Sequence, residues 1–217
     1  MKITSVEPQK KNPHRFNIFL DGLFAFGADE DLVVNRRLVL GKEISSEDLE
    51  KILFEVEVGK LMERMYRLFN VRQRSEKEVK DYLKNLAFKR KIKDQEEISE
   101  VTIQSLIDQL KRKGLIDDEQ FARAWVEARS KKYGPNRIKQ ELFQKGINRE
   151  IIEKVISDKR DEISGNEIAE KLLEKKMRIW KKLPALQFRK KATEYLMRRG
   201  FEYETIKIVV EKLIKNK

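Results

Sequence analysis

The feature that most constrains the fold of this chain is an internal repeat in its last third. Residues 138–156 align without gaps with residues 192–210, at an offset of 54 positions. Leucine, glycine, glutamate, isoleucine and valine recur at matching positions, and both copies have the pattern of helix, glycine, short turn, helix. Another helical segment precedes each copy, so the repeating unit has three helices. Such units bury their apolar faces on themselves and on their neighbours, which predicts a modular, elongated array.

A looser copy of the unit begins at Leu61, so three units would account for nearly all of residues 61–217. We therefore predict a mainly α fold of tandem three-helix repeats that form an elongated array, preceded by a small β-containing segment. The predicted divisions are 1–45 for the β-containing segment, 46–116 for the first repeat with its long leading helix, 117–160 for the second repeat and 161–217 for the third.

The first 45 residues have a strand pattern. Residues 3–7 alternate loosely as a short strand, and two β-rich runs flank Asp21-Gly22. This pair fits a two-residue type I′ turn, which needs positive φ at both central residues. We expect a hairpin within a three-stranded sheet, then a short helix over residues 30–35. Ser45 lies three residues before Asp48, which is typical of a capping box at the start of a long helix.

Three later features predict where helices begin and end. Residues 89–97 are polar and charged, and we expect a loop there. Gly114 fits the left-handed position after a helix end. Pro135 suits the first position of a helix.

The charge of the chain is uneven. The whole sequence carries 49 Lys+Arg and 37 Asp+Glu, a net charge of +12. Residues 1–60 have a net charge of −2, so the remaining residues carry +14. A basic region of this size commonly binds a polyanion or an acidic protein surface. A soluble helical protein that is simply rich in lysine is the alternative.

The composition argues against an enzyme, because residues typical of catalytic sites are missing or scarce. The chain has no cysteine and only one histidine, His14, which we place in a loop. It contains neither the G-x-x-x-x-G-K-[ST] nor the G-x-G-x-x-G phosphate-binding motif. Asp117 and Asp118 precede an apolar helical pattern, so helix capping accounts for them better than a metal or acid–base pair. We expect no catalytic residue, metal or cofactor. Without a membrane-spanning run or a signal sequence, we also expect a cytoplasmic protein that does not bind membranes.

Three clusters of basic residues are the candidate binding sites, because each lies in or just before the middle helix of its unit. Lysine and arginine beside helix N-termini can hold phosphates, and such contacts are independent of base sequence and sensitive to salt. The alternative for each cluster is a solvated charged face. The clusters are Arg72, Arg74, Lys77, Lys80 and Lys84; Lys131, Lys132, Arg137 and Lys139; and Arg189, Lys190, Lys191, Arg198 and Arg199.

Four aromatic residues, Tyr82, Trp125, Trp180 and Tyr195, could stack on bases. Tyr82, Trp125 and Tyr195 share a helical phase with apolar neighbours, which favours core or core-edge positions. The position of Trp180 among basic residues leaves both interpretations open.

Three motifs resemble the RecX family of bacterial recombinase regulators. The first is Gly-hydrophobic-hydrophobic-Asp-Asp with Phe-Ala and a following arginine, and here it comprises Gly114, Asp117, Asp118, Phe121, Ala122 and Arg129. The second is Arg72-Gln-Arg-Ser before a middle helix. The third comprises Gly134, Ile138, Glu141-Leu142 and Lys145-Gly146-Ile147. The resemblance covers about residues 61–215.

The resemblance implies a function that composition does not supply. Members of the family act on the RecA-type recombinase and its DNA filament, commonly inhibiting filament extension, ATPase activity and strand exchange, and they bind DNA. It also implies that the protein acts by binding and not by catalysis. The implied partners are the recombinase filament and single- and double-stranded DNA. We expect a monomer. The alternatives are a general nucleic-acid-binding protein with no recombinase-specific role and a purely protein-directed adaptor.

Overall fold

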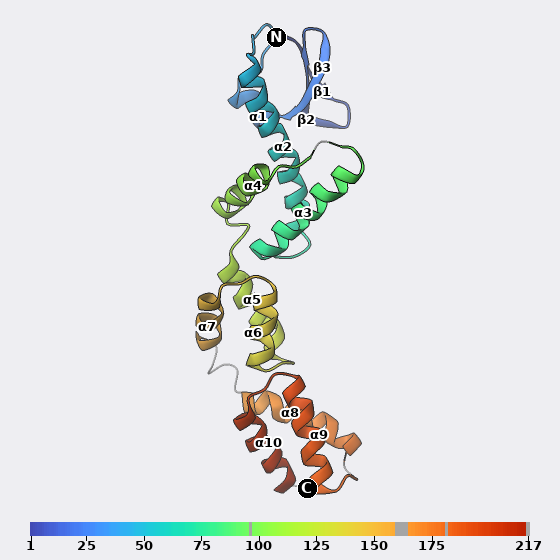
Figure 1. Ribbon diagram of the computed structural model, residues 1–217, viewed down its shortest axis with the longest axis vertical. Helices are drawn as coiled ribbons and strands as arrows, with labels where there is room; N and C mark the ends of the chain where they lie inside the picture. The colour runs from blue at the N-terminus through green and yellow to red at the C-terminus, as the bar shows by residue number, and fades with distance from the viewer. Residues whose placement is uncertain (96, 159–164, 181, 216–217) are drawn as a thin grey trace. The chain divides into compact units, whose positions relative to one another are not determined.

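The computed structural model describes all residues except 96, 159–164, 181 and 216–217. The described residues form three strands and ten helices, which confirms the predicted mainly α class with an N-terminal three-stranded sheet (Figure 1). They divide into two compact units. The first comprises Met1–Gln73 and Tyr82–Leu115, and the second comprises Arg74–Asp81 and Ile116–Lys217. The four-part division of the sequence stays a prediction.

The sheet of the first unit is antiparallel, with the order β1 (Ile3–Gln9), β2 (Asn12–Leu20), β3 (Leu23–Asp29). Between β2 and β3, Asp21 has φ +48° and Gly22 has φ +86°, as the predicted type I′ turn requires. His14 lies in β2, where the sequence analysis placed it in a loop. Proline at position 13 suggested that loop, but β2 tolerates it because the pairing of β1 with β2 is irregular between Asn12 and Phe16.

The first helices close one face of this sheet. Helix α1 (Glu30–Asn35) is capped by Asp29, and α2 (Ser46–Phe69) is capped by Ser45, whose Oγ accepts from the Asp48 N–H at 3.0 Å. This cap confirms the predicted start of the long helix. Apolar residues of α2 join the core of the sheet through Ile52 and Val56, both almost fully buried. The second half of α2 extends beyond that core and carries the basic residues Lys60, Arg64 and Arg67.

Helix α3 (Glu76–Ile92) is longer than predicted. The sequence analysis assigned residues 89–97 to a polar loop, whereas the helix continues to Ile92. Lysine and arginine are good helix formers, and three of them lie in the last turn, where positive charge interacts favourably with the helix dipole. Helix α4 (Glu100–Arg112) follows and ends at Gly114, whose φ of +68° confirms the predicted left-handed position after a helix.

The second unit contains two three-helix bundles, each with its own apolar core. Helices α5 (Asp118–Ser130), α6 (Pro135–Gln144) and α7 (Arg149–Asp158) form one bundle. Helices α8 (Gly165–Trp180), α9 (Ala185–Arg198) and α10 (Tyr203–Lys215) form the other. Pro135 occupies the first position of α6, as predicted, because its fixed φ suits a helix start and its missing N–H has no partner to lose there.

The Asp-Asp pair at the start of α5 caps two different helices. The Asp117 carboxylate accepts from the N–H of Gln120 at 2.9 Å, within its own helix. The Asp118 carboxylate accepts from the N–H of Glu76 at 2.9 Å, at the start of α3. The prediction of helix capping is therefore correct for both residues, although the second cap links segments 42 positions apart.

The start of α3 packs on the glycine turn between α6 and α7. The hydroxyl of Ser75 donates to the carbonyl of Lys145 at 2.7 Å, and the side chain of Lys77 lies against Gly146. Gly146 has φ +80°, and a Cβ added there would lie 2.5 Å from the Cβ of Lys77. Only glycine therefore fits this turn without displacing the start of α3.

The start of α6 packs in the same way on the matching glycine turn, between α9 and α10. The N–H of Gly134 donates to the carbonyl of Arg199 at 2.8 Å, and the N–H of Asn136 donates to that of Gly200 at 3.1 Å. Gly200 has φ +82°, and an added Cβ would lie 2.3 Å from the backbone nitrogen of Arg137. The two identical glycines of the sequence repeat therefore serve one recurring joint, in which the start of a middle helix rests on the turn of the following bundle.

Among the described residues, no helix is both long enough and apolar enough to cross a membrane.

Candidate functional site

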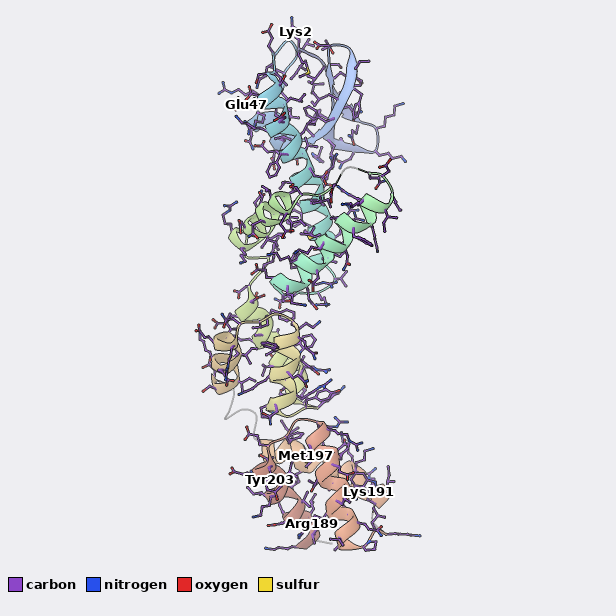
Figure 2. All side chains as sticks on the ribbon, in the orientation of Figure 1. Lys2, Glu47, Arg189, Lys191, Met197 and Tyr203 are labelled. Atoms are coloured by element: carbon purple, nitrogen blue, oxygen red, sulfur yellow. The ribbon has the colours of Figure 1, made fainter. Side chains whose placement is uncertain are left out.

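The basic cluster on α9 is the one most available for binding. Arg189, Lys190, Lys191 and Arg198 are all exposed, and none of them forms an ion pair with another described residue. Figure 2 labels Arg189 and Lys191 on this helix. Helix α9 has no acidic residue in its first turn, so the positive end of its dipole adds to the charge of these side chains. An uncompensated group of this kind attracts anions at long range.

The cluster around α6 is split between free and paired cations. Lys131 and Lys132 are exposed at the end of α5 and form no ion pair within the described chain. Lys139 donates to Glu153 at 2.6 Å, and Arg137 donates to Glu141 at 3.1 Å. The Lys139–Glu153 pair joins α6 to α7, whereas Arg137 and Glu141 both lie on α6. Both pairs partly neutralise the charge of the cluster before any ligand arrives.

The residues of the first predicted cluster belong to both compact units. Arg72 and Lys84 lie in the first unit, where Lys84 is 3.5 Å from Glu100. Arg74, Lys77 and Lys80 lie in the second. Lys77 pairs with Asp81 at 3.0 Å and packs on Gly146. The sequence analysis grouped these residues by proximity along the chain, whereas the boundary between the units passes through α3.

Arg199 has a structural role that the sequence analysis missed. Its Nη1 donates to the carbonyl of Lys132 at 2.8 Å, and its own carbonyl accepts from Gly134. The guanidinium also lies between two tyrosine rings, 5.5 Å from the centroid of Tyr133 and 4.9 Å from that of Tyr195. Arg199 therefore connects the two bundles of the second unit.

These contacts extend into an alternating stack of cations and aromatic rings along the second unit. Arg129 is 5.7 Å from the ring of Trp125 and 4.2 Å from that of Tyr133, and such contacts are favourable because the ring face is electron-rich. The members of this cation–aromatic stack, in order, are Lys145, Trp125, Arg129, Tyr133, Arg199, Tyr195 and Lys176. Because protein cations already cover these rings, the stack stabilises the unit rather than offering open faces to bases.

Trp125, Trp180 and Tyr195 pack on the two cores of the second unit. Trp125 stacks on Phe121 with 5.7 Å between ring centroids. Trp180 contacts Phe188 and Tyr195 edge to face, at 6.3 and 5.9 Å. The core-edge interpretation is therefore correct for Trp125 and Tyr195, and it also holds for Trp180, which the sequence left open.

Glu141 is the most buried acid described and the centre of a hydrogen-bond network. Its carboxylate accepts from Arg129 at 2.8 and 2.6 Å, from the indole N–H of Trp125 at 3.1 Å and from Arg137. Burial opposes the charged form, but the hydrogen bonds from Arg129, Trp125 and Arg137 outweigh it and lower the pKa of Glu141. This ionised carboxylate holds α5 against α6 and explains why the arginine and glutamate of the family-like motifs occur together.

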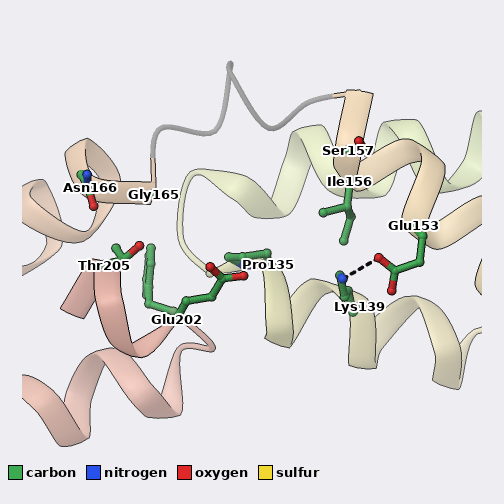
Figure 3. A pocket seen from close by; sticks show the side chains of 10 residues that line it. Pro135, Lys139, Glu153, Ile156, Ser157, Gly165, Asn166, Glu202 and Thr205 are labelled. Carbon is green, nitrogen blue, oxygen red and sulfur yellow. Dashed lines mark hydrogen bonds and ion pairs between the residues drawn. The ribbon is translucent and has the colours of Figure 1, made fainter. Parts of the chain in front are cut away.

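A cavity between the two bundles of the second unit is lined by two acidic residues and one basic residue. Lys139 and Glu153 form an ion pair on its wall, and Glu202 reaches toward Pro135 at the start of α6 (Figure 3). The hydrogen bond from Lys139 lowers the pKa of Glu153, which keeps that carboxylate ionised. No group of three or more described His, Asp or Glu residues is placed to hold a metal ion.

Comparison with known proteins identifies three segments of the chain. Residues 1–45 match the family described as the regulatory protein RecX N-terminal domain, residues 117–156 match the RecX second three-helix domain, and residues 165–210 match the RecX third three-helix domain.

Curated relatives match over nearly the whole chain. One named regulatory protein RecX, from Bacillus subtilis (strain 168), is 34% identical over 213 residues, covering 97% of this chain and 76% of the relative. Another of that name, from Clostridium perfringens (strain 13 / Type A), is 31% identical over 219 residues, covering 99% of this chain and 97% of the relative.

Solved structures agree with these matches. A crystal structure of regulatory protein RecX is similar over 100% of this chain and 99% of its own, with a TM-score of 0.74 and 28% identity. The crystal structure of RecX from Lactobacillus salivarius covers 72% of this chain and 96% of its own, with a TM-score of 0.61 and 25% identity. The motifs, the three-helix bundles and the similarity over the full length together place this chain in the RecX family of regulatory proteins.

Proposed function

We propose that this protein regulates a RecA-type recombinase by binding its DNA filament, and that it inhibits filament extension, ATPase activity and strand exchange. The observation that carries the proposal is family membership over almost the full chain, with relatives that are named as regulatory proteins. The free cations of α9 support the DNA part of the proposal, because uncompensated lysine and arginine side chains bind phosphates. Regulation would occur by binding alone.

The decisive experiment adds the protein to RecA polymerised on single-stranded DNA with ATP. We expect a lower ATPase rate, shorter filaments and slower strand exchange. If none of these three quantities changes, the recombinase proposal is wrong. If none of them changes and the protein still binds bare DNA under the same conditions, the two results together support a general nucleic-acid-binding protein.

Charge reversal on α9 tests which surface is used. The variant Arg189→Glu/Lys190→Glu/Lys191→Glu should bind DNA and the filament more weakly than the wild type while keeping a native circular-dichroism spectrum. A matched control changes three exposed lysines of α8 and α10, Lys171, Lys175 and Lys207, to glutamate. Equal loss of binding in both variants would mean that net charge, and not the α9 cluster, determines the affinity.

We propose a cytoplasmic monomer as the working form. Its mass in solution can be measured by sedimentation equilibrium, and a concentration-dependent increase above 25.9 kDa would contradict this expectation.

A further inference from the structure

A basic hollow on the first unit is lined by none of the basic residues considered above for binding. It is formed by the second half of α2, the residues that follow it and the part of α3 that belongs to the same unit. Four cations line it: Lys60, Arg64, Arg67 and Arg90. None of the described residues that line the hollow is acidic. Its volume, about 540 Å³, falls within the range of small-ligand pockets and suits a nucleotide-sized group.

The cations of the hollow are largely uncompensated. Lys60 and Arg64 are exposed and form no ion pair with a described residue, and Arg67 makes only a 3.5 Å hydrogen bond to the carbonyl of Glu63. Arg90 differs, because it pairs with Glu57 at 2.5 Å and both side chains are mostly buried. Arg90 therefore joins α3 to α2, and the other three provide the net positive charge.

The spacing of the three free cations suits a phosphate chain. Positions 60, 64 and 67 lie on one helical face, because residues three and four apart are neighbours on a helix surface. At 1.5 Å of rise per residue, the row extends about 10 Å along α2. Phosphates of a stacked strand follow one another at about 3.4 Å along the helix axis, so the row could contact three of them.

The apolar side chains of the hollow favour a nucleotide over a free phosphate. Tyr82 lines the hollow with the cations and is half-buried, and Val71, which also lines it, is 78% exposed. A free phosphate would use the cations alone and leave these side chains in water. A nucleotide also has a flat apolar base, which can stack on an aromatic ring or pack on an aliphatic side chain. Unlike the rings of the cation–aromatic stack, the ring of Tyr82 has no cation over it among the contacts of the described residues.

We propose that this hollow binds single-stranded nucleic acid, with backbone phosphates on Lys60, Arg64 and Arg67 and one unstacked base against Tyr82. The inference does not depend on the recombinase proposal, because the contact needs only the strand. It gives the first unit a nucleic-acid site of its own, although its first 60 residues have a net negative charge.

The test measures the affinity for a fluorescent thymine oligonucleotide by anisotropy, without recombinase, over a series of salt concentrations. The variant Arg64→Gln/Arg67→Gln should bind at least about tenfold more weakly, and its log–log salt slope should be shallower by about 1.4, the value for two lost contacts to a single strand. The control Lys10→Gln/Lys11→Gln removes two exposed cations from the turn between β1 and β2 of the same unit. It should bind as the wild type does, and equal weakening in the two variants would overturn the proposal.

Two further variants test the base contact. Tyr82→Phe keeps the ring and should retain the wild-type affinity, whereas Tyr82→Leu should lose about fivefold or more. A duplex of the same length should bind more weakly than the single strand, because its bases are not free to stack on the ring.

Inorganic polyphosphate is the competitor that separates a strand site from a plain anion site. If polyphosphate displaces the oligonucleotide as well as unlabelled thymine strand does, and Tyr82→Leu has no effect, the hollow is an anion site and the proposal is wrong. Thermal melting by circular dichroism checks that each variant is folded. Should the first double variant be unstable, Lys60→Gln/Arg64→Gln takes its place, since both side chains are exposed.

Discussion

The recurring joint makes a quantitative prediction for Gly200→Ala. The backbone at Gly200 has φ +82°, and a Cβ there would lie 2.3 Å from the nitrogen of Arg137. Gly114 occupies the same left-handed position after a helix, with φ +68°, but a Cβ there meets no atom within 4 Å. The pair therefore separates the cost of backbone conformation, which both substitutions share, from the cost of disrupting the joint.

The magnitudes follow from these contacts. Placing alanine in the left-handed region costs about 1–2 kcal/mol, and this is the whole expected effect of Gly114→Ala. In Gly200→Ala the start of α6 must also move, which breaks the hydrogen bond from Gly134 to Arg199. Gly134 is buried, and a buried N–H left without a partner costs about 1–3 kcal/mol. We expect Gly200→Ala to lower the free energy of unfolding by about 2–5 kcal/mol in total.

Denaturant unfolding can measure the difference. Far-UV circular dichroism follows both variants, and tryptophan fluorescence reports on the second unit alone, because Trp125 and Trp180 both lie there. Gly114 belongs to the first unit, so Gly114→Ala should shift only the circular-dichroism transition of that unit, whereas Gly200→Ala should shift the fluorescence transition of the second. The loss of unfolding free energy, measured for each variant in its own unit, should be larger for Gly200→Ala. If the two substitutions reduce stability equally, the close contact at the joint does not contribute and the reasoning is refuted.

Three other changes test the packing. Phe121→Ala should destabilise the second unit by about 3–5 kcal/mol, because the ring is almost fully buried, and an unchanged melting temperature would show that it is not a core residue. Ser75→Ala should cost about 1–3 kcal/mol in chemical denaturation, since it removes a helix cap and leaves the carbonyl of Lys145 without its donor. Glu141→Gln tests the pH dependence. Because the pKa of Glu141 is lowered on folding, its stabilising contribution is complete above its unfolded value of about 4.3 and is lost as the pH falls through the folded value. Wild-type stability should therefore fall more steeply with acid than that of the variant, and parallel curves would contradict the assignment.

Local chemistry made much of the fold predictable. Asp21-Gly22 specified a hairpin turn through its tolerance of positive φ, and Pro135 and Gly114 marked a helix start and a helix end for equally local reasons. The end of α3 was mispredicted because a run of charged residues is compatible with a loop or with an exposed helical turn. The ion pair from Arg90 to Glu57 favours the helix, and no local pattern shows that pair.

The candidate site was predictable only as a set of basic clusters. Local sequence grouped the cations of α9 but did not show whether they are paired. Glu194 lies one helical turn from Lys190 and Arg198, yet it forms no ion pair with either among the described residues. Local sequence also missed the contacts of Arg199, whose partner Lys132 lies 67 positions away, and of Arg137, which joins the network of Glu141. The hollow of the first unit was missed because Tyr82 and the cations of α2 belong to different helices.

The sequence by itself determined the class of this protein: a three-helix repeat, a β-hairpin, a basic C-terminal region and three family motifs. These features depend on periodicity, turn chemistry and residue type, which act over a few positions along the chain. Only the tertiary structure decided which charges are free to bind. Whether a lysine or arginine is neutralised depends on carboxylates and carbonyls that come within about 3 Å of it, and folding brings most of those from distant segments.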